Sequence, residues 1–432
     1  MKEGAVFTKM LRHPCFNGCG GKFSRIHLPV APGCNIQCNY CVRKFDCPNE
    51  SRPGVCASVL SPEEALERFR RVKQDMRNLT VAGIAGPGDT LANFEKTRKT
   101  FELIRREDKN IILCLSTNGL LLPRYIPELV ALNLSHLTVT INAVDPVIGK
   151  EIISFVDFNG QRLTGEEAAS VLINNQLEGL ARAAEAGLVC KVNCVMLKGI
   201  NESHIPAIIE TVKSYGACLT NIMQLIPVQG SVFEDMPLVS NQELSAMRKQ
   251  CETILPQMYH CKQCRADAVG PLHQDVSRLY AEQETKTVSQ AAPACPACKG
   301  GDENEDAADK PLIFAVATRD GKLVDQHFGH AEEFFIYTWD NGRISFVERR
   351  QVSQFCQGKA GCYDHESKIA ALIETLAGCA GVIALRIGEA PRYTLESKGI
   401  RAYMTYNKVE EAVKTAAEHC MAQKNEILLP IL

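Results

Sequence analysis

Three cysteines on one short segment are the residues of this chain best suited to chemistry. Cys34, Cys38 and Cys41 have the spacing C-x3-C-x2-C within Cys-Asn-Ile-Gln-Cys-Asn-Tyr-Cys. Iron–sulfur clusters normally take four cysteines, so three thiolates on one loop would leave one iron of a 4Fe-4S cube free for a substrate. A structural zinc site, the alternative, favours paired C-x2-C hooks and four closed ligands. The spacing therefore favours a cluster with one open iron.

The composition narrows the class of protein. The 432-residue chain has a net charge of −2, so no overall basic field attracts it to nucleic acid. It has no apolar run of about 18 residues and no N-terminal signal pattern. We therefore expect a cytoplasmic protein that binds neither nucleic acid nor membrane. The chain has 20 cysteines, and because the cytosol keeps thiols reduced, metal ligation is their leading explanation.

The first part of the chain alternates short β-rich runs with helical stretches. The predicted strands are 25–30, 79–85, 111–116, 137–142, 189–196 and 219–226. The predicted helices are 62–76, 91–107, 124–133, 165–187, 204–215 and 241–255. Six β/α repeats predict parallel strands joined by right-handed crossovers. The expected fold is α/β, a partial (β/α)6 barrel.

Two predicted strands carry polar residues where a closed barrel would be apolar. Thr138, Thr140 and Asn142 share one parity of the fourth strand, and Lys191 and Asn193 share one parity of the fifth. A closed eight-stranded barrel fills its interior with branched apolar side chains. The polar positions therefore predict a cavity that holds a ligand, with exposure at a sheet edge as the alternative.

A change of composition divides the chain. Residues 283–310 combine proline, glycine and an acidic run with almost no large apolar side chain, which predicts a flexible linker. Domain boundaries of 1–282 and 311–432 follow. Within the linker, Cys295 and Cys298 form a C-x2-C pair that could bind metal or shuttle redox equivalents.

The second domain is predicted to be a small α/β unit. Its strands are expected at 312–318, 333–339, 343–352, 381–386 and 400–405, and its helices near 366–377, 390–398 and 408–422. This order is typical of the ribonuclease-H-like fold. The acidic constellation of a nuclease is missing, so the fold does not imply that activity.

The cysteine loop is the signature of the radical S-adenosylmethionine (SAM) enzymes, and the resemblance extends further. Arg-Ile-His-Leu-Pro-Val-Ala-Pro at 25–32, Cys-Pro-Asn-Glu-Ser-Arg-Pro-Gly-Val at 47–55 and Cys-Lys-Gln-Cys-Arg-Ala-Asp-Ala-Val-Gly at 261–270 resemble the NifB family of nitrogenase-cofactor maturases. The match covers most of residues 10–280. The C-terminal segment resembles the nitrogenase-cofactor-binding, NifX-like domain that is often fused to it.

The resemblance implies a site for S-adenosylmethionine on the loops after the strands. The family's glycine-rich segment after the second strand, matched by Gly88, lets backbone approach the methionine group. Thr140 and Val192 match positions expected to contact the nucleoside. The residues expected to bind this cofactor are Gly86, Gly88, Asp89, Asn118, Thr140, Asn142 and Val192.

The resemblance also implies two auxiliary 4Fe-4S clusters. Cys261 and Cys264 would hold one of them, without an evident third ligand. The other would use Cys15, His27, Cys47 and Cys114. For His27 the alternative is a satisfied core histidine. An extra thiol at Cys19 could replace or compete with Cys15.

The implied activity is a step in building the iron–molybdenum cofactor of nitrogenase. Two 4Fe-4S units would be fused around a carbide derived from S-adenosylmethionine, giving an 8Fe core. The implied partners are iron–sulfur cluster donors, a reductant protein such as ferredoxin, and cofactor carrier and scaffold proteins. The alternatives are another radical enzyme with auxiliary clusters, such as a peptide-modifying one, and a non-catalytic iron–sulfur scaffold or carrier.

The second domain offers weaker candidates for iron ligation. Asp325-Gln-His327-Phe-Gly329 resembles the loop by which the cofactor-binding family holds an iron–sulfur cofactor. Imidazole is a plausible iron ligand, although His327 could equally be a surface histidine. Cys356 and Cys362 are further candidates.

Overall fold

The computed structural model describes residues 12–16, 22–43, 45, 50–272, 274–281, 311–352 and 372–426. Its contacts divide the chain into two compact units, Met1–Ala281 and Glu282–Leu432, and each is considered by itself. Several predicted positions lie outside the described residues: Cys19, Cys47, Cys295, Cys298, Cys356, Cys362 and the linker 283–310.

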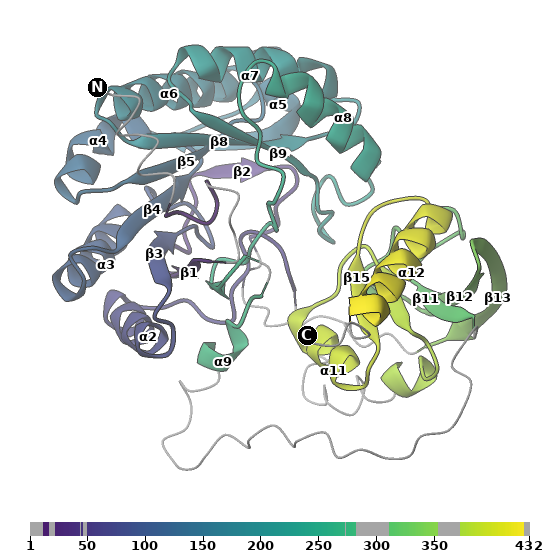
Figure 1. The fold of residues 1–432 in the computed structure, drawn as a ribbon. Coiled ribbons are helices and arrows are strands. Elements are labelled where there is room, and N and C mark those ends of the chain that lie inside the picture. Colours follow the sequence, from purple (N-terminus) through teal and green to yellow (C-terminus); the bar gives the residue numbers. More distant parts are fainter. Residues whose placement is uncertain are drawn as a thin grey trace. The chain divides into compact units, whose positions relative to one another are not determined.

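The first unit is built on a curved sheet with six parallel strands (Figure 1). In spatial order these are β1 (Ser24–His27), β3 (Leu79–Ile84), β4 (Ile112–Thr117), β5 (His136–Thr140), β8 (Val189–Met196) and β9 (Leu219–Gln224). Spatial order follows chain order, as consecutive β/α crossovers require. The predicted partial (β/α)6 barrel is confirmed.

Helices cover the convex face of this sheet (Figure 1). They are α2 (Pro62–Asp75), α3 (Phe94–Glu107), α4 (Leu122–Ala131), α6 (Gly165–Glu185), α7 (Ile205–Ser214) and α8 (Asn241–Glu252). Local sequence fixes where α2 begins, because the Ser61 hydroxyl accepts from the Glu64 N–H at 3.2 Å while Glu64 accepts from the Ser61 N–H. Fully buried side chains such as Phe69 and Phe101 pack into the core cluster of this unit.

A short antiparallel strand closes one edge of the sheet. Strand β10 (Val269–Gly270) pairs with β1, with Arg25 opposite Gly270 and Ile26 opposite Val269. The pairing brings a segment some 240 residues further along the chain against the first strand. The sequence analysis did not predict it, because a two-residue strand carries no periodic signal.

A second, three-stranded sheet was also not predicted. It consists of β2 (Ile36–Cys38), β6 (Ile153–Phe158) and β7 (Gln161–Leu163), and α5 (Pro146–Ile152) leads into it. Strand β2 lies within the cysteine loop and pairs antiparallel with β6, so that Cys38 lies opposite Ile153. The sheet therefore fixes the backbone that carries the thiols.

The second unit is a five-stranded sheet with helices on both faces. The strand order is β13 (Arg343–Gln351), β12 (Glu333–Asp340), β11 (Leu312–Val316), β14 (Gly381–Ala384) and β15 (Arg401–Met404). Strands β11, β14 and β15 are parallel, and β12 is antiparallel to both of its neighbours. The helix α12 (Val409–Glu426) packs on one face and α11 (Glu389–Ser397) on the other. The ribonuclease-H-like prediction is confirmed. Across the described parts of both units, no helix is long and apolar enough to cross a membrane.

Candidate functional site

The cysteine loop is held by its own hydrogen bonds and by the second sheet. The Asn39 N–H donates to the carbonyl of Ile152 at 2.9 Å. Within the loop, the Gln37 amide donates to the carbonyls of Cys38 (3.0 Å) and Cys41 (2.6 Å). Backbone groups that would otherwise need water are thus satisfied by protein. These hydrogen bonds therefore hold the backbone of the loop in a fixed conformation.

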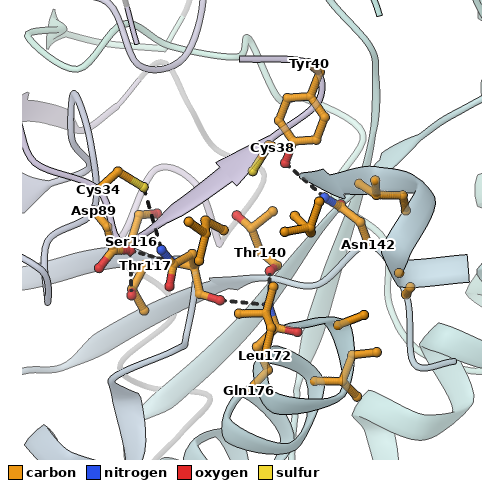
Figure 2. Close-up of a pocket in the computed structure, with 18 of the residues that line it drawn as sticks. Cys34, Cys38, Tyr40, Asp89, Ser116, Thr117, Thr140, Asn142, Leu172 and Gln176 are labelled. Atoms are coloured by element: carbon orange, nitrogen blue, oxygen red, sulfur yellow. Dashed lines mark hydrogen bonds between the residues drawn. The ribbon is translucent and has the colours of Figure 1, made fainter. Parts of the chain in front are cut away.

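The first cavity lies at the carboxyl ends of the parallel strands, where α/β barrels place their active sites. It encloses about 810 Å³ of space, including its open mouth. Figure 2 shows labelled side chains from the cysteine loop and from the ends of three strands facing this space. Of the predicted cofactor-binding residues, those on its wall are Gly88, Asp89, Asn118, Thr140 and Asn142, together with Cys34 and Cys38.

A buried carboxylate joins two of the loops around this cavity. One oxygen of Asp89 accepts from the N–H groups of Leu91 (2.9 Å) and Ala92 (3.1 Å). The other accepts from the Thr117 hydroxyl (2.8 Å) and the Asn118 N–H (2.6 Å). Burial raises the pKa of Asp89, and these four bonds oppose that shift because they favour the ionised form. Asp89 therefore ties the loop after β3 to the end of β4.

Gly88 lets two loop backbones touch. Its N–H donates to the carbonyl of Ala31 at 2.7 Å, and the next N–H donates to the carbonyl of Gly33 at 2.8 Å. A Cβ at this position would lie 2.2 Å from the Gly33 oxygen and 2.6 Å from the Pro32 oxygen. Only glycine fits there. The loop after β3 is consequently docked directly against the segment that leads into Cys34.

Gln176 is a wall residue that the sequence analysis missed. It lies on α6, is 3% exposed, and donates from its amide to the carbonyls of Asn118 (2.7 Å) and Thr140 (2.9 Å). The bonds connect the ends of β4 and β5. A glutamine on the otherwise apolar inner face of a helix was the available signal, because buried polar groups are almost always hydrogen-bonded.

Tyr40 is a second residue that the sequence analysis missed, although it lies within the cysteine motif. Its hydroxyl accepts from the Asn142 amide at 3.0 Å and is hydrogen-bonded to the Cys38 thiol. Burial raises the pKa of Cys38, and this hydrogen bond partly offsets the effect. The Tyr40 ring borders the first cavity and also the one beside it.

Two predicted cofactor-binding residues do not reach the wall of either cavity. Val192 is fully buried in the core cluster. Successive side chains of a strand point to opposite faces, so Lys191 and Asn193 face the cavity while Val192, between them, faces the helices. Gly86 also lies off both walls. It has a φ of +131°, which glycine tolerates, so its place is in the turn that presents Gly88.

A second, larger cavity adjoins the first and encloses about 1430 Å³ of space. Four residues line both cavities: Tyr40, Ala85, Ser116 and Thr140. Every described member of the two auxiliary ligand sets lies on the second wall, together with one thiol of the cysteine loop: Cys15, His27, Cys114, Cys261, Cys264 and Cys41. The structure thus brings together residues from both ends of the first unit.

The edge pairing of β1 with β10 orients the imidazole of His27. The His27 N–H donates to the carbonyl of Ala268 at 2.8 Å, and the ring Nδ1 lies 3.0 Å from the carbonyl of Arg265. Because a carbonyl can only accept, the proton lies on Nδ1 and leaves Nε2 free to bind metal. Burial and the nearby charge of Arg25 lower the pKa of His27 to about 4, so the ring is neutral.

The thiols in the second cavity are strongly desolvated. Burial raises the pKa of Cys15 to about 11 and that of Cys114 to about 12. The Arg25 guanidinium donates to the Cys264 sulfur at 3.2 Å and to the carbonyls of Gly270 and Pro271. Arg25 is 1% exposed. A buried cation against a sulfur is an arrangement that favours the thiolate.

This donor set fits iron–sulfur clusters. None of the described cysteines forms a disulfide. Nor do any three His, Cys, Asp or Glu side chains of the described residues gather closely enough to hold a single metal ion. Cysteine sulfurs and neutral imidazoles spread around a cavity are suited to the several irons of a cluster. The cysteine loop itself supplies three sulfur donors, Cys34, Cys38 and Cys41, as its motif predicts.

In the second unit, His327 lies in a sheltered turn. Its Nδ1 accepts from the Gly329 N–H at 3.1 Å, and its ring centroid lies 4.9 Å from that of His330. Burial, together with His330 and Arg386, lowers the pKa of His327 to about 3. The ring is therefore neutral, the form in which imidazole binds metal.

Comparisons with known proteins agree with this architecture. The family model of the Radical SAM superfamily matches residues 28–212, and the one described as Dinitrogenase iron-molybdenum cofactor matches residues 310–419. The chain is therefore a radical SAM protein, with a 4Fe-4S cluster and S-adenosylmethionine as the cofactors that this class implies.

Relatives over nearly the whole length narrow the assignment. The FeMo cofactor biosynthesis protein NifB of Klebsiella pneumoniae is 42% identical over 91% of this chain and 87% of its own length. The protein of the same name in Azotobacter vinelandii is 37% identical over 98% and 89%. The chain belongs to the NifB family. Among solved structures, Streptococcus suis SuiB bound to S-adenosylmethionine is 12% identical over 61% of this chain and 67% of that chain, with a TM-score of 0.41.

Proposed function

We propose that this protein builds the 8Fe core of the nitrogenase cofactor, by fusing two 4Fe-4S units around a carbon taken from S-adenosylmethionine. The observation that carries the proposal is the shared wall between two cavities. One cavity is lined by the cysteine loop and the strand-end loops, and the other by sulfur and imidazole donors. A radical formed in the first cavity would need to cross only that shared wall to reach the second cavity.

The first cavity would hold the resident cluster and S-adenosylmethionine. Cys34, Cys38 and Cys41 would hold that cluster, which would supply the electron for reductive cleavage of S-adenosylmethionine. The chain's own residues would bind and orient S-adenosylmethionine. Gly88 lets backbone approach the methionine group, and Thr140 and Asn142 offer polar groups on the opposite wall. Proximity of this kind is what an enzyme contributes to a difficult bond cleavage.

The second cavity would hold the iron–sulfur substrate. Cys261 and Cys264 would bind one 4Fe-4S unit, and Cys15, His27 and Cys114, with Cys47 outside the described residues, would bind the other. In the proposed reaction, one S-adenosylmethionine gives a methyl group to a sulfide of the substrate. The radical from a second molecule then removes hydrogen from that methyl group. Cofactors and substrate carry the chemistry, and the protein supplies position and electrostatics.

The second unit would receive or pass on the product. Its match to the Dinitrogenase iron-molybdenum cofactor family and the neutral imidazole of His327 support a role in binding an iron–sulfur cofactor. The proposed partners are therefore cluster donors, a reductant protein such as ferredoxin, and the carrier and scaffold proteins that take up the product.

Product analysis of anaerobically reconstituted full-length protein tests the proposal. With dithionite and S-adenosylmethionine, the protein should form both 5′-deoxyadenosine and S-adenosylhomocysteine. The variant Cys38→Ala should form neither, because the resident cluster loses a ligand. Cys251→Ala, which removes a core thiol away from both cavities, should retain both products. A non-catalytic carrier would form neither compound. 5′-Deoxyadenosine without S-adenosylhomocysteine would point to a radical enzyme that transfers no methyl group.

A further inference from the structure

Lys191 is a buried cation for which the protein supplies no counter-charge. It lies on β8, is 6% exposed and borders the second cavity. No carboxylate lies within 4.0 Å of its ammonium among the described residues. Its ammonium donates to the Met258 sulfur at 3.9 Å and lies 5.0 Å from the centroid of the Phe16 ring.

These neighbours do not compensate the charge. Burying an ammonium without an anionic partner is costly. A thioether is only a weak acceptor, and a cation–π contact recovers only part of that cost. A buried lysine without an anionic partner in the protein is suited to hold an anionic ligand.

The rest of the second cavity favours an anion. Its described wall includes Arg52 and Lys262 in addition to Lys191, and no aspartate or glutamate. The Glu50 carboxylate pairs with Arg52 at 2.7 Å but is not on the wall. A cavity lined by cations without carboxylates concentrates negative charge.

The position of Lys191 also matches one of the two ligand sets. Its ammonium lies 5.0 Å from the ring centroid of Phe16, the residue that follows Cys15, and Cys15 and Cys114 line the same cavity as Lys191. Cys264 instead has the Arg25 guanidinium at 3.2 Å. The second cavity therefore has one buried cation in contact with Cys264 and another close to the segment that carries Cys15.

We propose that Lys191 binds the anionic iron–sulfur unit held by Cys15 and Cys114, supplying the positive charge that lets a thiolate-ligated cluster enter a buried site. The inference rests on the proposed function, because it assigns an electrostatic partner to one of the two substrate units. Lys191 is a binding residue in this account, since its ammonium faces the substrate.

Iron content gives the first test. Full-length Lys191→Met should lose one cluster, about four iron atoms per chain, after anaerobic reconstitution with iron and sulfide. It should retain the cluster on Cys34, Cys38 and Cys41, whose ligands lie on the cysteine loop and not on β8. Lys191→Arg, which keeps the charge, should retain the iron. The control Lys198→Met removes a half-exposed lysine paired with Glu243 at 2.6 Å and should bind iron like the wild type.

The stability of the iron-free protein separates ligand binding from a structural role. Without iron, Lys191→Met should melt at a temperature equal to that of the wild type or roughly 2–4 °C higher, because an uncompensated buried charge has been removed. A lower melting temperature would mean that Lys191 stabilises the fold itself, and the inference would be wrong.

The outcomes distinguish this inference from the proposed function. If the wild type takes up several clusters and Lys191→Met takes up as many, only the role of Lys191 is overturned. If the wild type itself takes up a single cluster, the proposed function fails, and the role of Lys191 fails with it.

Discussion

The two cavities of the first unit differ in how their polar groups are satisfied. On the described wall of the first, every buried side-chain nitrogen and oxygen has a hydrogen-bond partner. On that of the second, His13 Nε2 and Asn221 Oδ1 are buried without one, and Lys191 lacks a carboxylate. The protein therefore satisfies the buried polar side chains around the first cavity, whereas it leaves some of those around the second without partners.

The difference agrees with the functions proposed for the two cavities. A site that cleaves a cofactor gains from groups fixed in advance, because their reorganisation then costs nothing during the reaction. In the proposed function the second cavity receives 4Fe-4S units, and these would supply partners for groups that the protein alone leaves unsatisfied. Unsatisfied polar groups of this kind cost stability and are typical of functional sites.

The largest effect is expected where the first cavity is most tightly built. Gly88→Ala places a Cβ against the carbonyl oxygens of Pro32 and Gly33, so the segment before Cys34 must move. A displacement of about 1 Å can cost on the order of 100-fold in rate, and we expect a loss of that size in reductive cleavage of S-adenosylmethionine. The measurement is the rate of 5′-deoxyadenosine formation with dithionite.

A glycine elsewhere in the same unit serves as the control. Gly160 has a φ of +78°, and a Cβ there would meet nothing within 4 Å. Gly160→Ala should cost about 1 kcal/mol of stability through backbone strain and leave the cleavage rate unchanged. Equal rates for the two variants would show that the close approach of the loops does not position the cysteine segment.

A matched pair of asparagines tests the comparison directly. The Asn142 side chain accepts from the Val195 N–H at 2.8 Å and donates to the Tyr40 hydroxyl at 3.0 Å. The Asn221 side chain makes one bond, to Asn193 at 3.1 Å, and its own oxygen has no partner. Asn142→Ala should lower the free energy of unfolding by about 2 kcal/mol, and Asn221→Ala by about 0.5 kcal/mol or less.

Urea unfolding of the iron-free protein measures both values. The two residues are similarly buried, at 9% and 1% exposure, so loss of side-chain packing contributes comparably. If Asn221→Ala cost as much as Asn142→Ala, the second cavity would be as complete as the first, and the contrast between the two cavities would disappear.

Sequence patterns predicted the parts of this site that depend on local order. The strand 189–196 was predicted with the bounds that the structure has. Its parity correctly separated Lys191 and Asn193, on the cavity side, from the apolar positions. A period of two and a three-cysteine motif are properties of neighbouring residues, so they can be read from the chain itself.

The remainder depends on contacts between distant segments. The pairing of Cys38 with Ile153 and of Arg25 with Gly270 joins residues more than a hundred positions apart, through strands of three and two residues. A polar residue on an apolar helix face indicated that Gln176 is buried, but nothing near it in the sequence indicated which carbonyls it would bind. Tertiary packing decides such contacts, and local preference does not.

A further prediction concerns Tyr40, one of the four residues that border both cavities. The Tyr40 hydroxyl is hydrogen-bonded to the Cys38 sulfur, and hydrogen bonds to ligating sulfurs stabilise the reduced, more negative cluster. Tyr40→Phe removes that bond, worth about 1 kcal/mol. The midpoint potential of the cluster on the cysteine loop should therefore fall by about 40 mV for one electron. A redox titration followed by electron paramagnetic resonance measures the shift.

Tyr215→Phe is the matched control, because Tyr215 is 38% exposed at the end of α7 and lines neither cavity. It should leave the potential unchanged. The direction of the shift in Tyr40→Phe is the decisive result. A more positive potential would mean that the hydroxyl does not donate to the Cys38 sulfur in the loaded protein. The first cavity would then rearrange when its cluster binds, and it would not have been complete beforehand.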